Sequence, residues 1–300
     1  MKVVLAGAFG KLGSDILRAV VAAGHETVAA DLMIRELDGL DPSSYTTRQI
    51  DVQNPENLKG LCDGADVVIT TVGLTGASTK VNNYDIDYKG NLNLLNEAKA
   101  AGVKKFVYIS VINADKGDGI PMVHSKYLLE QDLKASGVPY VIHRPTGYFY
   151  DIAHVFWPMI LDNKVQLLKG TPKKANVIDT KDFARFIVET MNENNVTYNV
   201  GGTETYTYQE IAAMFYAANG VTNGPIKYAP AWMFDVLAKL PKIKKEGKVD
   251  IMKFSKFTLS NDCYGDTEVP GLSFKQYIAD KSYAPVIEAE LAAKKAAAGK

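Results

Sequence analysis

A glycine-rich turn near the N-terminus constrains this fold more than any other feature of the sequence. The segment LAGAFGKLGSDI places Gly7, Gly10 and Gly13 after a short apolar run, Val3–Ala6, and at the start of a helical pattern that continues over Ser14–Ala23. Glycines at such a junction let the backbone turn tightly, approach a pyrophosphate and pack helix against strand. The N–H groups of the new helix would face phosphate oxygens. The context therefore predicts a dinucleotide site, although the spacing Gly-x-x-Gly-x-x-Gly differs from the ordinary Gly-x-Gly-x-x-Gly.

Short apolar runs alternate with helical patterns through the first half of the chain. Further strand-like runs are Thr27–Ala30, Ala65–Val72, Lys105–Val111 and Tyr140–His143. Helices are expected from Pro55, near Tyr84–Ala101, and over Met122–Ser136. Continuous apolar strands separated by helices of this length are typical of a parallel sheet covered on both faces. The sequence therefore predicts an α/β fold, a doubly wound parallel sheet.

The rhythm of the sequence changes after Pro145. A helix at Phe183–Met191 and a strand at Thr197–Val200 are expected to return to the sheet. We therefore predict a dinucleotide-binding domain of residues 1–145, with 175–202 returning to it. Residues 146–174 and 203–300 would form a smaller, mostly helical substrate-binding region. Its aromatic residues are expected to line a substrate cleft: Tyr148, Phe149, Tyr150, Phe156 and Trp157.

An acidic residue ends the second predicted strand. Asp31 would accept hydrogen bonds from the adenosine ribose hydroxyls, and it would repel a 2′-phosphate. This placement favours NAD(H) as the cofactor. Arg35 leaves NADP(H) possible, because a nearby arginine can neutralise that phosphate.

Composition excludes several classes of partner and site. Lys+Arg and Asp+Glu balance at 34 each, so no bulk charge selects nucleic acid or an anionic membrane. The two cysteines, Cys62 and Cys263, lie outside any metal-ligand spacing, and no metal site is predicted. The N-terminal apolar run is too short for a signal peptide, and no stretch approaches the roughly 18 apolar residues that span a bilayer. A cytoplasmic protein is expected.

Several segments together resemble a known superfamily. These are GAFGKLG, DVQNPENLKGLCDGADVVITTVG, YKGNLNLLNEAKAAGVKKFVYIS and VIHRPTGYF, and they resemble the short-chain dehydrogenase/reductase superfamily in its atypical, NmrA-like branch. The resemblance covers residues 1–202 well. It implies NAD or NADP binding, and many members are oxidoreductases. Besides the three glycines and Asp31, it places beside the cofactor Phe9, Lys11, Leu12, Asp51, Val52, Thr71, Val72, Gly73, Lys126 and Pro145.

The same resemblance makes the helix MVHSKYLLEQDLKASG informative. In the catalytic members a tyrosine, the acid/base, precedes by four positions a lysine that holds the nicotinamide ribose. That interval puts both side chains on one helix face. Lys126 fits the lysine, but Met122 occupies the tyrosine's position, and a thioether cannot transfer a proton. Tyr127 does not replace the tyrosine, because adjacent helical residues point about 100° apart.

Two further residues are candidates for catalysis. Ser110 lies near where the superfamily keeps a serine that hydrogen-bonds substrate, with Val111 as the alternative register. Tyr148, or its neighbour Tyr150, could supply a hydroxyl from the loop after the last strand. Packing is the ordinary role of aromatic residues in such a loop.

Two classes of function stay open at this point. The first is an oxidoreductase that acts on a small-molecule substrate, such as a quinone or a conjugated or aromatic compound, without the usual tyrosine. The second is a non-catalytic dinucleotide sensor that controls a protein partner. Separately, seven lysines between Lys239 and Lys256 indicate a solvated face, or a docking patch for an anionic partner, with Glu246 and Asp250 opposing the second interpretation.

Overall fold

An eight-stranded parallel sheet organises the computed structural model, which describes residues 1–74, 76–170 and 172–298. The strand order is β12-β9-β6-β5-β4-β1-β2-β3, and every neighbouring pair is parallel. The strands are β1 Lys2–Ala6, β2 Glu26–Asp31, β3 Thr46–Gln49, β4 Val67–Thr70, β5 Lys105–Ile109, β6 Tyr140–Pro145, β9 Val196–Gly202 and β12 Thr267–Val269. The order reverses between β1 and β4, and the carboxyl ends at such a switch point form a crevice for ligands. The predicted fold class is confirmed.

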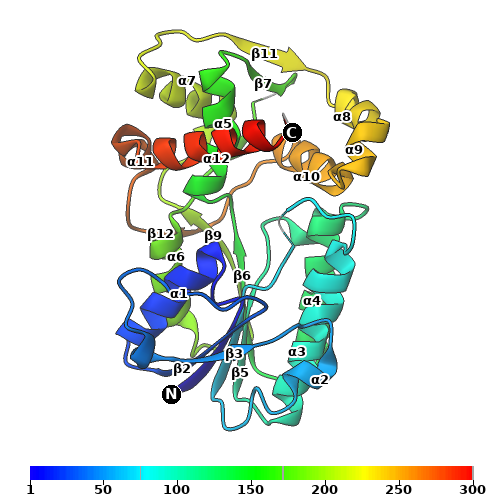
Figure 1. The fold of residues 1–300 in the computed structure, drawn as a ribbon, viewed down its shortest axis with the longest axis vertical. Helices are drawn as coiled ribbons and strands as arrows, with labels where there is room; N and C mark the ends of the chain where they lie inside the picture. The colour runs from blue at the N-terminus through cyan, green and yellow to red at the C-terminus, as the bar shows by residue number, and fades with distance from the viewer. Residues whose placement is uncertain (75, 171, 299–300) are drawn as a thin grey trace.

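Helices cover both faces of this sheet. Figure 1 shows α1 (Lys11–Ala22) and α6 (Thr180–Thr190) to the left of the sheet, and α2 (Pro55–Leu58), α3 (Asn91–Ala100) and α4 (Pro121–Ala135) to its right. Side chains alternate along each strand, so successive residues enter different cores. In β4, Val67 and Ile69 join the core with α1 and α6, whereas Val68 joins the core with α3 and α4.

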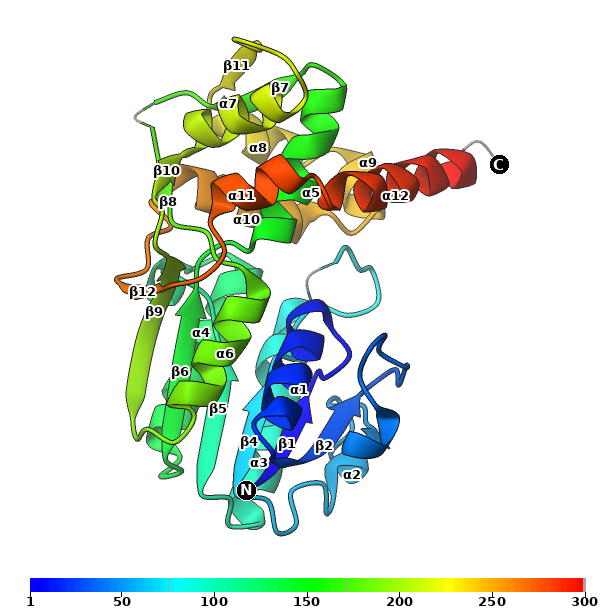
Figure 2. The same ribbon diagram turned by 90° about the vertical axis from the view of Figure 1, so that its left-hand side faces the viewer.

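A second region stands over the carboxyl ends of the strands, where β6 leads upwards into it (Figure 1). Its helices are α5 Phe149–Leu161, α7 Tyr208–Ala218, α8 Trp232–Leu237, α9 Pro241–Lys245, α10 Val249–Ser260, α11 Phe274–Asp280 and α12 Tyr283–Ala298. It also holds two short strand pairs, β7 (Val165–Leu168) with β11 (Ile226–Ala229) and β8 (Lys174–Ala175) with β10 (Tyr206–Thr207). Figure 2 shows α12 projecting from this region beyond the edge of the sheet.

Three short helices complete the secondary structure. They are η1 Pro42–Ser44, the π-helix η2 Tyr84–Gly90, and η3 Ala114–Lys116. η2 runs directly into α3, so the single helix predicted over Tyr84–Ala101 consists of a π-helical and an α-helical part.

The structure departs from the sequence predictions in the second region. The side chains of Phe149, Phe156 and Trp157 are buried together with Phe215 and Phe274. They form the core of that region, so the expectation that they line a cleft is wrong. The strand β12 belongs to the range assigned to the second region, yet it pairs with β9 and extends the main sheet. Among the described residues, no helix combines the length and the apolar character that crossing a bilayer requires.

Candidate functional site

The three glycines of the first loop differ in what a side chain at each position would contact. Gly7 has φ +80°, and a Cβ there would lie 2.5 Å from Thr71 Oγ1. A Cβ on Gly13 would lie 1.9 Å from the carbonyl oxygen of Gly7, so helix α1 could not approach the loop. Gly10 has φ −69° and is exposed, and its Cβ would meet only Gly7 O, at 3.3 Å. The fold itself therefore requires Gly7 and Gly13, whereas Gly10 leaves open the surface that a pyrophosphate would approach.

Asp31 and Arg35 both hold the backbone of this loop at Phe9. The Phe9 N–H donates to Asp31 Oδ2 at 2.9 Å, and Arg35 Nη2 donates to the Phe9 carbonyl at 2.6 Å. The carboxylate and the guanidinium thus lie at the same place, beside the loop and at the carboxyl end of β2. A ribose 2′-substituent bound there would meet both charges.

A surface pocket adjoins Asp31 at the carboxyl ends of β2 and β3. It has a volume of about 470 Å³ and is lined by Leu32, Arg48, Gln49, Ile50, Asp51, Glu56 and Asn57. Asp51 thus faces the space where the resemblance expects adenine. Val52 is buried instead, and it fills the space that a side chain on Gly90 would need, because a Cβ there would lie 2.6 Å from Val52 Cγ2. Val52 therefore supports the floor behind this pocket.

The segment after β4 connects the glycine loop to α3 and α4. Thr71 Oγ1 donates to the Gly7 carbonyl at 3.0 Å, and Asn91 Nδ2 donates to the Val72 carbonyl at 3.0 Å. A Cβ on Gly73 would lie 2.8 Å from Asp87 Oδ1 and 3.3 Å from Lys126 Nζ. The three predicted residues therefore form one continuous wall between the glycine loop and Lys126.

Lys126 forms an ion pair with a buried carboxylate that sequence analysis missed. Its Nζ lies 3.2 Å from Asp87 Oδ1, with side-chain exposures of 18% for the lysine and 2% for the aspartate. Asp87 Oδ2 accepts hydrogen bonds from Leu74 N and Asn83 Nδ2, at 2.9 and 3.0 Å. The ammonium also donates to the Ile109 carbonyl at 3.4 Å and lies over the Tyr108 ring. Two of its three protons therefore have oxygen acceptors among the described residues.

The hydroxyl of Ser110 is bound to a buried network instead of facing the crevice. It donates to Glu130, whose carboxylate is fully buried and also accepts from Arg144 Nε and Nη2 at 2.9 and 2.6 Å. The hydrogen bonds that Arg144 donates to Glu130 raise the pKa of Arg144. In this structure the Ser110 hydroxyl therefore serves as a hydrogen-bond donor to a buried carboxylate. The catalytic role stays a prediction, which this hydrogen bond disfavours.

Tyr148 packs on the other side of the sheet, towards α6. Its ring stacks on Tyr150 with centroids 5.8 Å apart and contacts Phe183, and burial raises the pKa of its phenol well above 10. Lys11 at the start of α1 lies over the Tyr150 ring at 4.9 Å. Within the described residues, no hydrogen bond joins Tyr148 to Lys126 or Ser110. Pro145 is buried at the end of β6, where its carbonyl accepts from Ile112 N at 2.9 Å.

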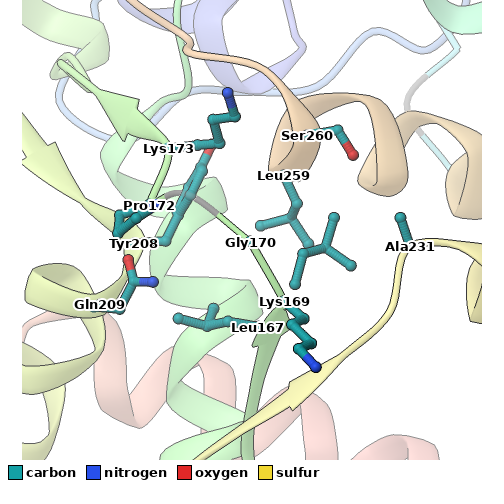
Figure 3. A pocket seen from close by; sticks show the side chains of 11 residues that line it. Leu167, Lys169, Gly170, Pro172, Lys173, Tyr208, Gln209, Ala231, Leu259 and Ser260 are labelled. Atoms are coloured by element: carbon teal, nitrogen blue, oxygen red, sulfur yellow. The ribbon is translucent and has the colours of Figure 1, made fainter.

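A separate cavity of about 150 Å³ lies inside the second region (Figure 3). Residues of β7, α7 and α10 line it, including Leu167, Tyr208 and Leu259, and none of the predicted site residues does. In Figure 3 the ammonium groups of Lys169 and Lys173 point away from its centre. The cavity is therefore distinct from the crevice at the glycine loop.

Several known proteins with different names are similar to this chain. Photosystem II assembly factor Ycf39 of Cyanophora paradoxa is 26% identical over 235 residues, which cover 76% of this chain and 73% of that protein. Triphenylmethane reductase of Citrobacter sp., solved with NADP(H), has a TM-score of 0.73 at 17% identity and covers 93% of this chain and 100% of its own. An NADPH-dependent quinone oxidoreductase of Escherichia coli has a TM-score of 0.73 at 19% identity, covering 93% and 98%.

A family profile described as NAD(P)H-binding matches residues 7–194. The match begins at Gly7 and ends after α6, so it contains the glycine loop, Asp31, the wall after β4 and the Lys126–Asp87 pair. Sequence motif, strand order and profile agree, and the predicted superfamily resemblance is confirmed. This chain belongs to the NAD(P)H-binding family.

Proposed function

We propose that the protein is an oxidoreductase that transfers hydride between a nicotinamide dinucleotide and a small conjugated substrate, such as a quinone or an aromatic compound. The observation that carries the proposal is Lys126, held by Asp87 beside the glycine loop, with Met122 one turn before it. The lysine of the superfamily is present and oriented, whereas the proton-transferring tyrosine is absent.

The residues present fit a dinucleotide, because Gly10 leaves an open approach and Asp51 lines a pocket at the adenine end. The loop N–H groups would bind the pyrophosphate, and Lys126 would donate its third proton to the nicotinamide ribose. When bound, the cofactor would supply the hydride.

A conjugated substrate suits a site without an acid. Reduction of a quinone or a conjugated double bond spreads negative charge over several atoms, so it depends less on a proton donor fixed at one oxygen than ketone reduction does. Water would supply the protons, because Met122 has none and Ser110 donates to Glu130. Structural neighbours named as reductases of quinones and triphenylmethane dyes support this substrate class.

We further propose that NADH binds more tightly than NADPH. Asp31 lies at the ribose end of the crevice, where it would accept from hydroxyls and repel a 2′-phosphate. Arg35 opposes this preference from the other side of Phe9. Two structural neighbours are described with NADP(H) or NADPH, and a third is described with NAD. A cytoplasmic location belongs to the same proposal.

The second candidate is a dinucleotide sensor that binds a protein partner. Two observations favour it: Met122 at the tyrosine position, and the commitment of Ser110 to a structural network. Relatives named as photosystem II assembly factors support it too, since that name describes an assembly role rather than a reaction. The two candidates share the dinucleotide site and differ in turnover.

Calorimetric titration with NADH and NADPH, followed by NADH oxidation with a series of quinones, tests the proposal. Lys126→Ala should weaken dinucleotide binding by about 1.5–3 kcal/mol, the range for hydrogen bonds to charged groups, and should lower turnover. Lys99→Ala, an exposed lysine on α3, is the control. Because Lys126→Ala leaves Asp87 buried and unpaired, Lys126→Met combined with Asp87→Asn provides a variant without either charge. Binding without turnover on any conjugated acceptor would favour the sensor, and unchanged binding in both variants would remove Lys126 from the site.

A further inference from the structure

The helices α8 and α9 expose an unusual combination of side chains. Neither helix has a buried residue, and together with the turn between them they cover residues 232–245. Trp232 is 62% exposed, and Val236, Leu237 and Leu240 are exposed as well. Figure 1 shows both helices at the right-hand edge of the second region, with α10 beside them. We propose that these two helices form a docking surface for the anionic headgroups of a lipid bilayer, named here the α8–α9 surface.

The exposed apolar residues of the α8–α9 surface come from α8 and from the turn that follows it. Trp232 and Val236 lie four residues apart on one face of α8, and Leu240 follows in the turn just before α9. The helix α8 is attached to the protein through Asp235, which pairs with Lys256 of α10 at 2.7 Å. An ordinary solvated face would carry polar residues at those positions, so solvation alone does not explain it.

Lysines follow directly on these apolar residues. Lys239, Lys242, Lys244 and Lys245 are all within seven positions, and in the part of the chain that the structure describes none of them has a carboxylate within 4.0 Å. Two of the acidic residues nearby are already paired, Asp235 with Lys256 and Glu246 with Lys248, so Asp250 is the acidic residue of this stretch that opposes the basic charge. The whole chain is neutral, but this short segment is basic. The expectation that no membrane is a partner came from the bulk charge and did not consider this local excess.

The mixture of side chains favours a lipid surface over a protein interface. Protein interfaces are depleted in lysine at their centres, whereas here lysines and apolar residues alternate over a few turns. Short basic amphipathic helices with tryptophan and leucine lie in the headgroup layer of anionic membranes. The long lysine stems can reach lipid phosphates while the indole enters the interface.

Vesicle co-sedimentation of the full chain tests the proposal, comparing phosphatidylcholine vesicles with vesicles that also contain phosphatidylglycerol. The chain should bind the anionic vesicles, and added salt should weaken binding. Replacing Lys242, Lys244 and Lys245 by glutamate should lower the partition coefficient at least about 100-fold, from about 1 kcal/mol for each lysine. The matched control replaces Lys59, Lys99 and Lys116, exposed on the sheet domain, by glutamate and should bind as the unmodified chain does.

A second variant, Trp232→Ser with Leu240→Ser, separates insertion from charge attraction. It should weaken vesicle binding by a similar factor at high and low salt, since the apolar contribution is not screened, whereas the effect of the lysine substitutions should shrink as salt is added. Equal binding to neutral and anionic vesicles, or equal loss in the control triple variant, would overturn the proposal. Absence of vesicle binding together with a dimer that the same substitutions dissociate, measured by light scattering, would assign the surface to a second copy of the chain and also overturn it.

Discussion

The two faces of the main sheet bury different chemistry. On the α1 and α6 face, the strands present apolar residues, and the one buried ionisable side chain from β6, His143, stays neutral: burial lowers its pKa to about 3. On the α3 and α4 face, the strands present Thr70, Ser110 and Arg144, which contact Asn91 and Glu130 on the helices. Alternation along the strands assigns each residue to its face, so both faces bury an apolar core, and the α3 and α4 face adds buried polar and charged contacts to it.

This difference shows where the family can change its chemistry. The α1 side contributes backbone, namely the glycine loop and the start of a helix, and its side chains serve packing. The α4 side contributes charges that point at the carboxyl ends of the strands, including Lys126. Substitutions on the two sides should therefore differ in whether they lower the stability of the fold or weaken ligand binding.

The largest expected effect is on the charged face. Glu130→Ala leaves the guanidinium of Arg144 buried without its carboxylate, which should lower the free energy of unfolding by about 3–5 kcal/mol. Urea denaturation measures this loss. Gln131→Ala, the exposed neighbour on the same helix, should change it by less than about 0.5 kcal/mol. A similar small change for Glu130→Ala would mean that the two faces do not differ in this way.

On the backbone side, two glycines should separate binding from folding. Gly10→Val puts a branched side chain on the open surface of the loop and should weaken dinucleotide binding by about 2–4 kcal/mol, with little change in melting temperature. Gly13→Ala should instead lower the melting temperature, because its Cβ would overlap Gly7 O at 1.9 Å. Calorimetry and thermal unfolding on both variants measure the pair. Unchanged affinity in Gly10→Val would remove the loop from the cofactor site.

His143 provides a pH test of the apolar face. Thr190 Oγ1 donates to the Phe186 carbonyl and therefore accepts from His143 Nε2–H. Burial keeps this imidazole neutral in the folded protein because it lowers the pKa. Its folded pKa of about 3 lies below the usual 6.5, so the unfolded chain binds the proton first and stability falls as the pH drops below 6.5. Between pH 6.5 and 5 this residue should cost about 2 kcal/mol of unfolding free energy. His143→Phe should remove that part of the pH dependence; an identical slope in the variant would contradict the neutral burial.

The smallest expected effect concerns cofactor choice at the edge of the site. Asp31→Ser should bring the affinities for NADH and NADPH closer by about 1 kcal/mol, since one partly exposed carboxylate acts through a screened environment. Competitive titration with the two reduced cofactors measures the ratio. Equal or reversed affinities in the unmodified chain would show that Arg35, bound to the same loop residue, governs the choice.

Much of the sheet domain could be predicted because its signals are local. Apolar runs, glycine turns and the Pro55 helix start specify β1, α1, β4, β5 and α2 from neighbouring residues alone. The strand β3 (TTRQ) was not predicted, because this edge strand buries little and has no apolar run. The helix α5 was not predicted either, since its all-round apolar character and internal Pro158 hide any helical period.

The residues of the candidate site likewise divide into those that could be predicted from the sequence and those that could not. The glycines and Asp31 have motif spacing and could be read from the sequence, and Lys126 follows from a resemblance. Asp87 could not, because its role depends on contacts with Leu74 and Lys126, which come from two other segments, besides Asn83 at the start of its own helix. The engagement of Ser110 by Glu130 likewise needs the register of β5 against α4. Buried charge pairs of this kind leave no periodic mark in a sequence.

The contact between Lys126 and Asp87 depends on chain length as well as on residue type. Asp87 lies within the π-helix η2, whose wider turn holds one residue more than an α-helical turn, and Asn91 Nδ2 donates to the Ile86 and Asp87 carbonyls at its end. Deleting one residue between Asp87 and Asn91 would let an ordinary α-helical turn replace the wider one and would change where Asp87 lies relative to Lys126. An insertion or deletion in a helix can therefore break an ion pair although both residues of that pair are retained.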